Sequence, residues 1–309
     1  MKNETVTFLI TAMCSLGIFG SASATAGAFD GAIRPVSNPV FSDSPDVGTS
    51  VHPFFMYNAL PDVVNTELGA LPVGGQYEVI AVQVEVALSD TFSIIAVKDG
   101  YIDFEADETL SSDESGIGDI AAGVKWVFHK DEEAGLLFSA RTVIELPLGD
   151  DDVWQGNGDG TIAPAVSVLK IAGKSQVVGT LGFIQPFDTG AESSEFYTAW
   201  HLSHALTDRV SPLVELNYFR VISEGDGETQ FSNHVDGGVP GVAQFEGGDL
   251  VNLGASNADK NEDLVTLAAG ARVRVTDSID LGGVYEIPLT DDENSLMDHR
   301  ITVDAVFRF

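Results

Sequence analysis

The sequence predicts an all-β protein: a transmembrane antiparallel β-barrel of about twelve strands, with short periplasmic turns and long extracellular loops. Three observations predict this fold. Long segments alternate apolar and polar residues, the connections between them alternate between short and long, and the last segment, 296–309, has one apolar face and ends in Phe309. Alternation with a period of two places the two kinds of side chain on opposite faces of a strand, so one face can contact lipid and the other water.

The first 26 residues read as a secretory signal peptide. Lys2 precedes an apolar run over 6–19, and small residues around Ala24 offer cleavage sites. Export to the outer membrane of a Gram-negative bacterium is therefore expected. Cys14 lies inside the apolar run, so the predicted mature chain has no cysteine and can form neither a disulfide nor a thiolate metal site.

Residues 27–50 are rich in Pro, Ser, Asp and Gly and are expected to be irregular. This segment could hang in the periplasm or enter the barrel lumen, and the sequence leaves both open. Residues 51–309 are expected to form the barrel.

Charge and hydropathy limit the alternatives. The chain has 47 acidic and 15 basic residues and a net charge of −32, which argues against nucleic acid as a partner. No later segment has the continuous apolar length of a membrane helix, so a bilayer would have to be crossed by closed strands. A single large soluble β domain is the alternative that length alone allows.

Period-two segments bounded by turn residues predict the strands in chain order. They run over 51–58, 77–88, 91–99, 117–129, 134–148, 162–172, 175–186, 195–206, 209–222, 263–275, 278–289 and 296–309. Most match or exceed the roughly 9–11 residues that a tilted strand needs to cross a bilayer. The sorting of turns and loops by length is typical of outer-membrane barrels, whose short turns are periplasmic.

Most of these strands favour one apolar face. In 77–88, for example, Ile80 and Leu88 lie on the face opposite Gln83 and Glu85. The strands at 51–58 and 162–172 do not favour either face.

Two motifs and the chain end carry a family resemblance. Residues 116–128 begin Gly-x-Gly-Asp and end Gly-x-Lys-aromatic-x-Phe, residues 145–150 read Glu-Leu-Pro-Leu-Gly-Asp, and the chain ends Phe-Arg-Phe. From about residue 75 onward the chain resembles the outer-membrane transporters linked to the phenol-degradation meta pathway. The resemblance implies a porin-like barrel that passes small, often aromatic or apolar, compounds. It also implies that Phe307 and Phe309 form the signal read by the outer-membrane barrel assembly machinery. The acidic loop 223–262 does not match the family pattern.

The predicted lumen face carries charges of both signs. Charged side chains inside a narrow barrel must pair with one another or stay hydrated, because desolvating an isolated ion is costly. The lumen and selectivity candidates are Glu85, Asp119, Lys125, Arg141, Glu145, Glu215, Arg272, Arg274, Glu286, Arg300, Asp304 and Arg308. They could form charge ladders that select a polar solute. They could equally form a salt-bridged interior with little open channel, in a structural or interaction barrel.

Enzymatic and metal chemistry find weak support. His201 and Ser203 share a strand face, as nucleophilic catalysis could use, but that face is predicted to meet the lumen. Acidic triplets such as 150–152 lack the spacing of a calcium loop, so no metal site and no cofactor are expected. The expected partners are outer-membrane lipid and lipopolysaccharide, a small-molecule solute and the assembly machinery.

Overall fold

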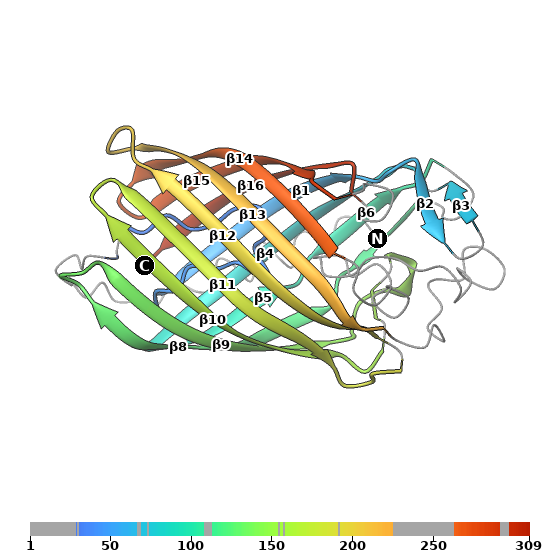
Figure 1. The fold of residues 1–309 in the computed structure, drawn as a ribbon, viewed down its shortest axis with the longest axis horizontal. Coiled ribbons are helices and arrows are strands. Elements are labelled where there is room, and N and C mark those ends of the chain that lie inside the picture. Colours follow the sequence, from blue (N-terminus) through green and yellow to red (C-terminus); the bar gives the residue numbers. More distant parts are fainter. Residues whose placement is uncertain are drawn as a thin grey trace, which may run out of the picture.

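A computed structural model describes the protein. The described residues are 29, 31–66, 69–72, 74–107, 113–153, 155–156, 158–190, 192–224, 263–290 and 297–309. The predicted signal peptide and all but the first two residues of the acidic loop 223–262 lie outside them. The described strands are tilted relative to the long axis and wrap into a barrel (Figure 1). Among the described residues, no helix is long and apolar enough to cross a membrane.

One antiparallel sheet closes on itself to make the barrel. Its order is β1-β16-β15-β14-β13-β12-β11-β10-β9-β8-β5-β4, and pairing between β1 and β4 closes it. The bounds are β1 Ser50–Ala59, β4 Gln76–Ser89, β5 Phe92–Lys98, β8 Ile120–Asp131, β9 Leu136–Leu146, β10 Thr161–Ala172, β11 Ser175–Pro186, β12 Ser194–His204, β13 Val210–Ser223, β14 Asp263–Thr276, β15 Ile279–Pro288 and β16 His299–Arg308. This order confirms the predicted twelve-stranded closed barrel.

Short turns gather at one end of the barrel and long connections at the other (Figure 1). We call these the turn end and the loop end; in outer-membrane barrels the turn end faces the periplasm. The chain finishes at the turn end, where Phe309 is 73% exposed.

Four further strands and one short helix lie in the connections between the predicted strands, apart from Ile117, which the prediction assigned to strand 117–129. β6 (Tyr101–Glu105) continues β5 along β4, and β7 (Glu114–Ile117) precedes β8 and pairs with β6. β2 (Val63–Thr66) and β3 (Gly69–Pro72) form a separate hairpin at the loop end, and a 3₁₀ turn spans Asp151–Val153.

The break between β5 and β6 depends on a glycine. Gly100 has a φ of +128°, and a Cβ there would lie 2.7 Å from the carbonyl oxygen of Ile80. Only glycine adopts this conformation without strain. The bend it allows ends β5 at Lys98, close to the end of the predicted strand 91–99, and separates it from β6.

The predicted faces agree with the burial pattern. Large apolar side chains such as Ile80, Leu88 and Trp126 are exposed on the outer wall, whereas Gln83 and Glu85 are buried inside. The two strands without a clear face, β1 and β10, carry apolar residues on the inner face too, and this obscured the alternation. Their inward residues include Phe54, Met56, Ala163 and Ala165.

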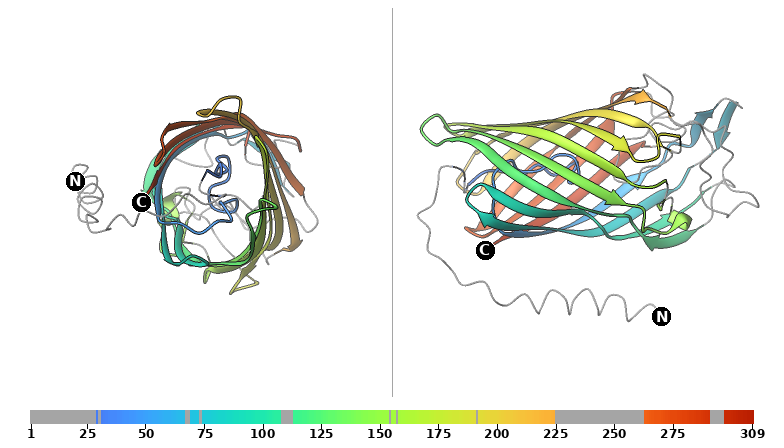
Figure 2. Two further views of the ribbon diagram at one scale, coloured as in Figure 1. Left: turned by 90° about the vertical axis from the view of Figure 1, so that its left-hand side faces the viewer. Right: turned by 90° about the horizontal axis from the view of Figure 1, so that it is seen from below.

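The segment before β1 lies inside the barrel. Viewed along the barrel axis, residues 31–49 fill part of the ring of strands (Figure 2). Most of these residues are buried and none belongs to a strand. We call residue 29 and residues 31–49 the plug. Of the two placements that the sequence left open for this segment, the periplasm and the lumen, the structure has the plug in the lumen.

Candidate functional site

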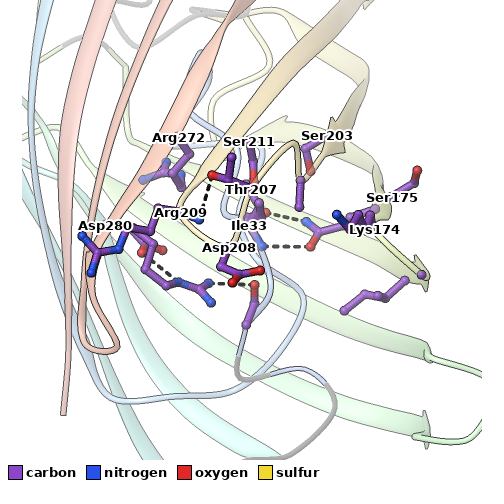
Figure 3. Close-up of a pocket in the computed structure, with 16 residues that line it drawn as sticks. Ile33, Lys174, Ser175, Ser203, Thr207, Asp208, Arg209, Ser211, Arg272 and Asp280 are labelled. Atoms are coloured by element: carbon purple, nitrogen blue, oxygen red, sulfur yellow. Dashed lines mark hydrogen bonds and ion pairs between the residues drawn. The ribbon is translucent and has the colours of Figure 1, made fainter.

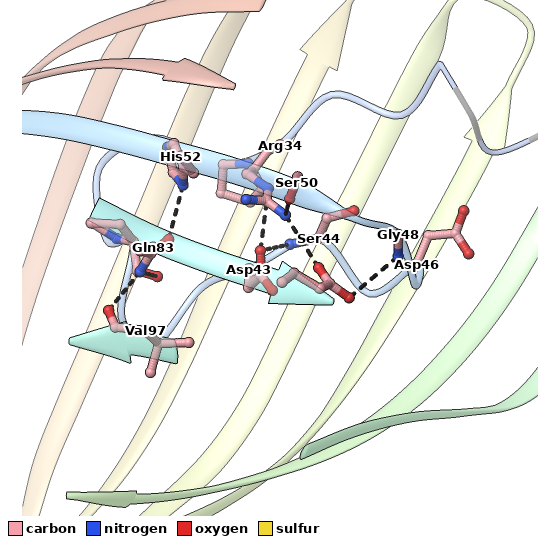
Figure 4. A network of polar contacts seen from close by, with 12 residues as sticks. Arg34, Asp43, Ser44, Asp46, Gly48, Ser50, His52, Gln83 and Val97 are labelled. Atoms are coloured by element: carbon pink, nitrogen blue, oxygen red, sulfur yellow. Dashed lines mark hydrogen bonds and ion pairs between the residues drawn. The ribbon is translucent and has the colours of Figure 1, made fainter. Parts of the chain in front are cut away.

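A cluster of four charges joins the plug to the wall inside the lumen. Lys125 Nζ lies 2.8 Å from Asp43 of the plug and 2.9 Å from Glu85 of β4, and Arg34 of the plug reaches the same two carboxylates at 3.3 and 3.4 Å. Figure 4 shows the plug side of this network beside β1 and β4. Burial alone would raise the pKa of Asp43, but the charges of Arg34 and Lys125 hold it well below its usual range. Each of the two carboxylates is therefore paired with both cations.

Wall side chains also bind the plug backbone directly. Glu215 accepts the N–H groups of Val36 at 2.9 Å and Ser37 at 2.6 Å. Arg272 donates to the carbonyl of Arg34 at 3.0 Å, and Arg141 donates to that of Val40 at 2.8 Å. Arg274 donates to the carbonyl of Gly31 at 2.9 Å. Because the plug has no sheet partner, these side chains satisfy backbone groups that would otherwise be buried unpaired.

Six of the twelve candidate residues thus contact the plug. They are Glu85, Lys125, Arg141, Glu215, Arg272 and Arg274. Four others pair within the wall. Asp304 binds Arg272 at 2.7 Å, Arg300 lies 3.8 Å from Glu286, and Arg308 binds Asp280.

The remaining two candidates meet at the loop end. Lys98 Nζ lies 2.9 Å from Glu145 and 3.8 Å from Asp119, which also accepts the N–H groups of Gly149 and Gly156. Glu192, from the β11–β12 loop, lies near this group, and its Oε2 is buried without a hydrogen-bond partner. Burial, followed by the negative charge of Glu145, raises the pKa of Glu192 to about 8.

The loop half of the lumen is largely apolar. Phe41 of the plug packs against Tyr197 at 5.0 Å and Phe219 at 5.7 Å between ring centroids. Inward side chains from the wall join the same cluster, among them Phe54, Met56, Tyr77, Val79, Ile95, Phe104 and Leu264. The lumen of a transmembrane barrel is ordinarily polar, so this apolar lining needs a separate explanation. The polar exceptions in this half include Asn58, Asn217, Glu286 and Arg300, which lie close together.

Several lumen residues were missed as candidates. His52 bonds Gln83 at 2.9 Å and Asp304 at 2.7 Å, and both Lys98 and Asp280 form ion pairs. Gln176 holds both backbone groups of Ile33. The period of two places Gln83 on the inner face of its strand and could have found Gln176 in the same way. His52 lies on a strand with no clear face.

The pair His201 and Ser203 faces the lumen, as its strand position predicted. His201 Nδ1 binds Glu215 at 2.7 Å, while its Nε2 and the hydroxyl of Ser203 make no hydrogen bond to each other. A histidine that activates a serine needs that bond. Across the described residues, no three His, Cys, Asp or Glu side chains form a group that could hold a metal ion.

A closed antiparallel barrel with an apolar outer face defines the class of outer-membrane β-barrel proteins. The chain belongs to the family described as "Putative MetA-pathway of phenol degradation", whose model matches residues 57–282. An outer-membrane channel from Pseudomonas putida F1 has a similar structure, with a TM-score of 0.62 and 13% identity, over 89% of this chain and all of that one.

Two porins were also found. NanC has a TM-score of 0.47 and 5% identity over 84% of this chain and all of its own; KdgM has a TM-score of 0.44 and 8% identity over 84% of this chain and 99% of its own. Among curated proteins, none matches the sequence.

Proposed function

We propose that this outer-membrane barrel passes small molecules that carry an apolar or aromatic part, and that the plug controls their passage. The observation that carries the proposal is the apolar lining of the loop half of the lumen around Phe41, Tyr197 and Phe219. A lumen that holds only water or salt bridges is lined by polar side chains and does not require inward aromatic rings.

The lining supplies a binding energy of the right size. Burying about 100 Å² of an apolar solute contributes roughly 2–3 kcal/mol. That is enough to favour entry from water and too little to trap the solute, as conduction requires. Beyond the cluster, the solute would meet the polar turn half and the plug. Movement of the plug, rather than of the wall, is then the step that opens the path.

Uptake by cells tests this function. Cells that express the protein should take up radiolabelled 1-naphthol faster than cells with an empty vector, because lipopolysaccharide is a poor solvent for such compounds. Phe41→Asn, which makes the plug polar at the cluster, should lower the rate. Phe187→Asn is the matched control, because Phe187 is 54% exposed and lies outside the cluster. Equal uptake with and without the assembled protein would exclude the proposal.

A structural barrel without an open pore is the second candidate. The dense bonding between plug and wall favours it, since ten or more polar contacts hold the plug in place. Planar-bilayer conductance separates the two. A silent wild type together with a silent variant lacking residues 29–47 would favour the structural role.

A further inference from the structure

A polar cavity opens at the turn end of the barrel, between the plug and the wall. Its volume is about 330 Å³, and its walls come from Gly31 and Ile33 of the plug and from β10 to β15 with their turns. Figure 3 shows the labelled lining residues around Ile33. The cavity is separate from the apolar cluster and from the four-charge network around Lys125. A volume of this size suits a small organic molecule.

The cavity concentrates positive charge in a strongly acidic protein. Four basic side chains line it, Lys174, Arg209, Arg272 and Arg274, against two acidic ones, Asp208 and Asp280. The chain as a whole has a net charge of −32. A basic cleft with low-dielectric walls raises the local concentration of anions.

The two deeper cations are already paired, and the two outer ones are not. Arg272 binds Asp304, while Arg274 and Arg308 share the single carboxylate of Asp280. Within the described part of the chain, Lys174 and Arg209 form no ion pair. Their charges are therefore available to a ligand that enters from the turn end.

The cavity also has a buried hydroxyl without a partner. Ser203 lines it, is 2% exposed, and its Oγ makes no hydrogen bond to any described residue. A buried polar group left unpaired costs roughly 1–3 kcal/mol. An oxygen-bearing ligand that accepts a hydrogen bond from this hydroxyl removes that cost.

We propose that this cavity binds a small oxyanion, one that carries a carboxylate or a phosphate group. Lys174 and Arg209 attract and hold the negative charge, and Ser203 donates a hydrogen bond to one oxygen. Ion pairs with Asp304 and Asp280 hold Arg272 and Arg274 in place on the inner side of the cavity. The site lies where a solute leaves the barrel on the turn side, yet its binding does not depend on whether the barrel conducts.

Isothermal titration of the purified, folded full-length protein tests the site at low ionic strength. Sodium phosphate and sodium benzoate are the two probes, and choline chloride is the cationic control. We expect the wild type to bind at least one of the anions and not choline. Stronger binding of benzoate identifies a carboxylate site, and stronger binding of phosphate identifies a phosphate site.

The variant Lys174→Gln/Arg209→Gln should weaken anion binding at least about tenfold, because it removes both free charges. Ser203→Ala should weaken it by about threefold or more. Lys170→Gln is the matched control, since Lys170 is an exposed lysine of β10 near the turn end that does not line the cavity. A heat-dependent shift in gel migration checks that each variant is folded.

Three results would overturn the proposal. One is that neither anion binds the folded wild type. Another is that the double variant binds as well as the wild type. The last is that Lys170→Gln weakens binding as much as the double variant, because binding would then follow net charge and not the cavity.

Discussion

The carboxylate of Glu215, on β13, accepts the backbone N–H of Ser37 at 2.6 Å, across 178 positions of the chain. The same carboxylate accepts the N–H of Val36 and binds His201, so one wall residue holds two consecutive plug amides. Glu215 therefore fixes the plug to the barrel wall at two adjacent backbone positions.

Removing the carboxylate of Glu215 should loosen the plug without disrupting the strand pairing of the barrel wall. Glu215→Ala leaves two buried N–H groups unpaired, and hydrogen bonds to a charged group are worth roughly 1.5–3 kcal/mol each. We expect the single-channel conductance in planar bilayers to rise several-fold. Glu133→Ala, in an exposed turn, is the control and should leave conductance unchanged. A conductance equal to that of the wild type would mean that other contacts alone hold the plug.

The four-charge network should show strong coupling. Lys125→Met leaves Asp43 and Glu85 with less positive charge inside the barrel, and breaking a buried pair costs about 3–5 kcal/mol. We expect urea unfolding in lipid vesicles to show a loss of that order. Adding Glu85→Gln should restore part of it, because the remaining charges then balance better. Strictly additive losses in this double-mutant cycle would show that the two residues are not coupled.

Protonation of Glu192 should make stability depend on pH. Its pKa is about 8 in the folded protein and has an ordinary value of 4.5. Between these values the folded state holds a proton that the unfolded state has lost, so stability falls as the pH rises from about 4.5 to 8. Melting temperatures across this range should decline in the wild type and decline less in Glu192→Gln. Glu133→Gln should follow the wild type, and an identical slope in all three proteins would disprove the role of Glu192.

The outward phenylalanines at the end of β16 are proposed to direct assembly. Phe309→Ser should reduce the amount of folded protein recovered in the outer membrane, while leaving the lumen contacts of β16 intact. Phe187→Ser removes an equally apolar, exposed ring at the loop end and serves as control. The measurement is the ratio of folded to unfolded bands in membrane fractions. Equal ratios in the two variants would argue against a signal at this position.

Local patterns predicted the barrel because a strand records its two faces in its own residues. Ile301 and Val303 face outward and Arg300 and Asp304 inward, as the alternation of β16 indicated. The lengths of the connections likewise predicted which end carries the turns. The same period of two predicted that the charged residues face the lumen, but it did not predict which groups they contact there.

The tertiary structure alone placed residues 31–49 inside the lumen. Nothing periodic marks that segment, and its position depends on contacts such as Glu215 with Ser37 and Lys125 with Asp43, which join residues far apart in the chain. The tertiary structure also brings the inward apolar residues of β1 and β10 into one cluster with Phe41 of the plug. Alternation along a strand is local and can be read from the sequence, whereas the content of the lumen is set by long-range contacts that no single segment encodes.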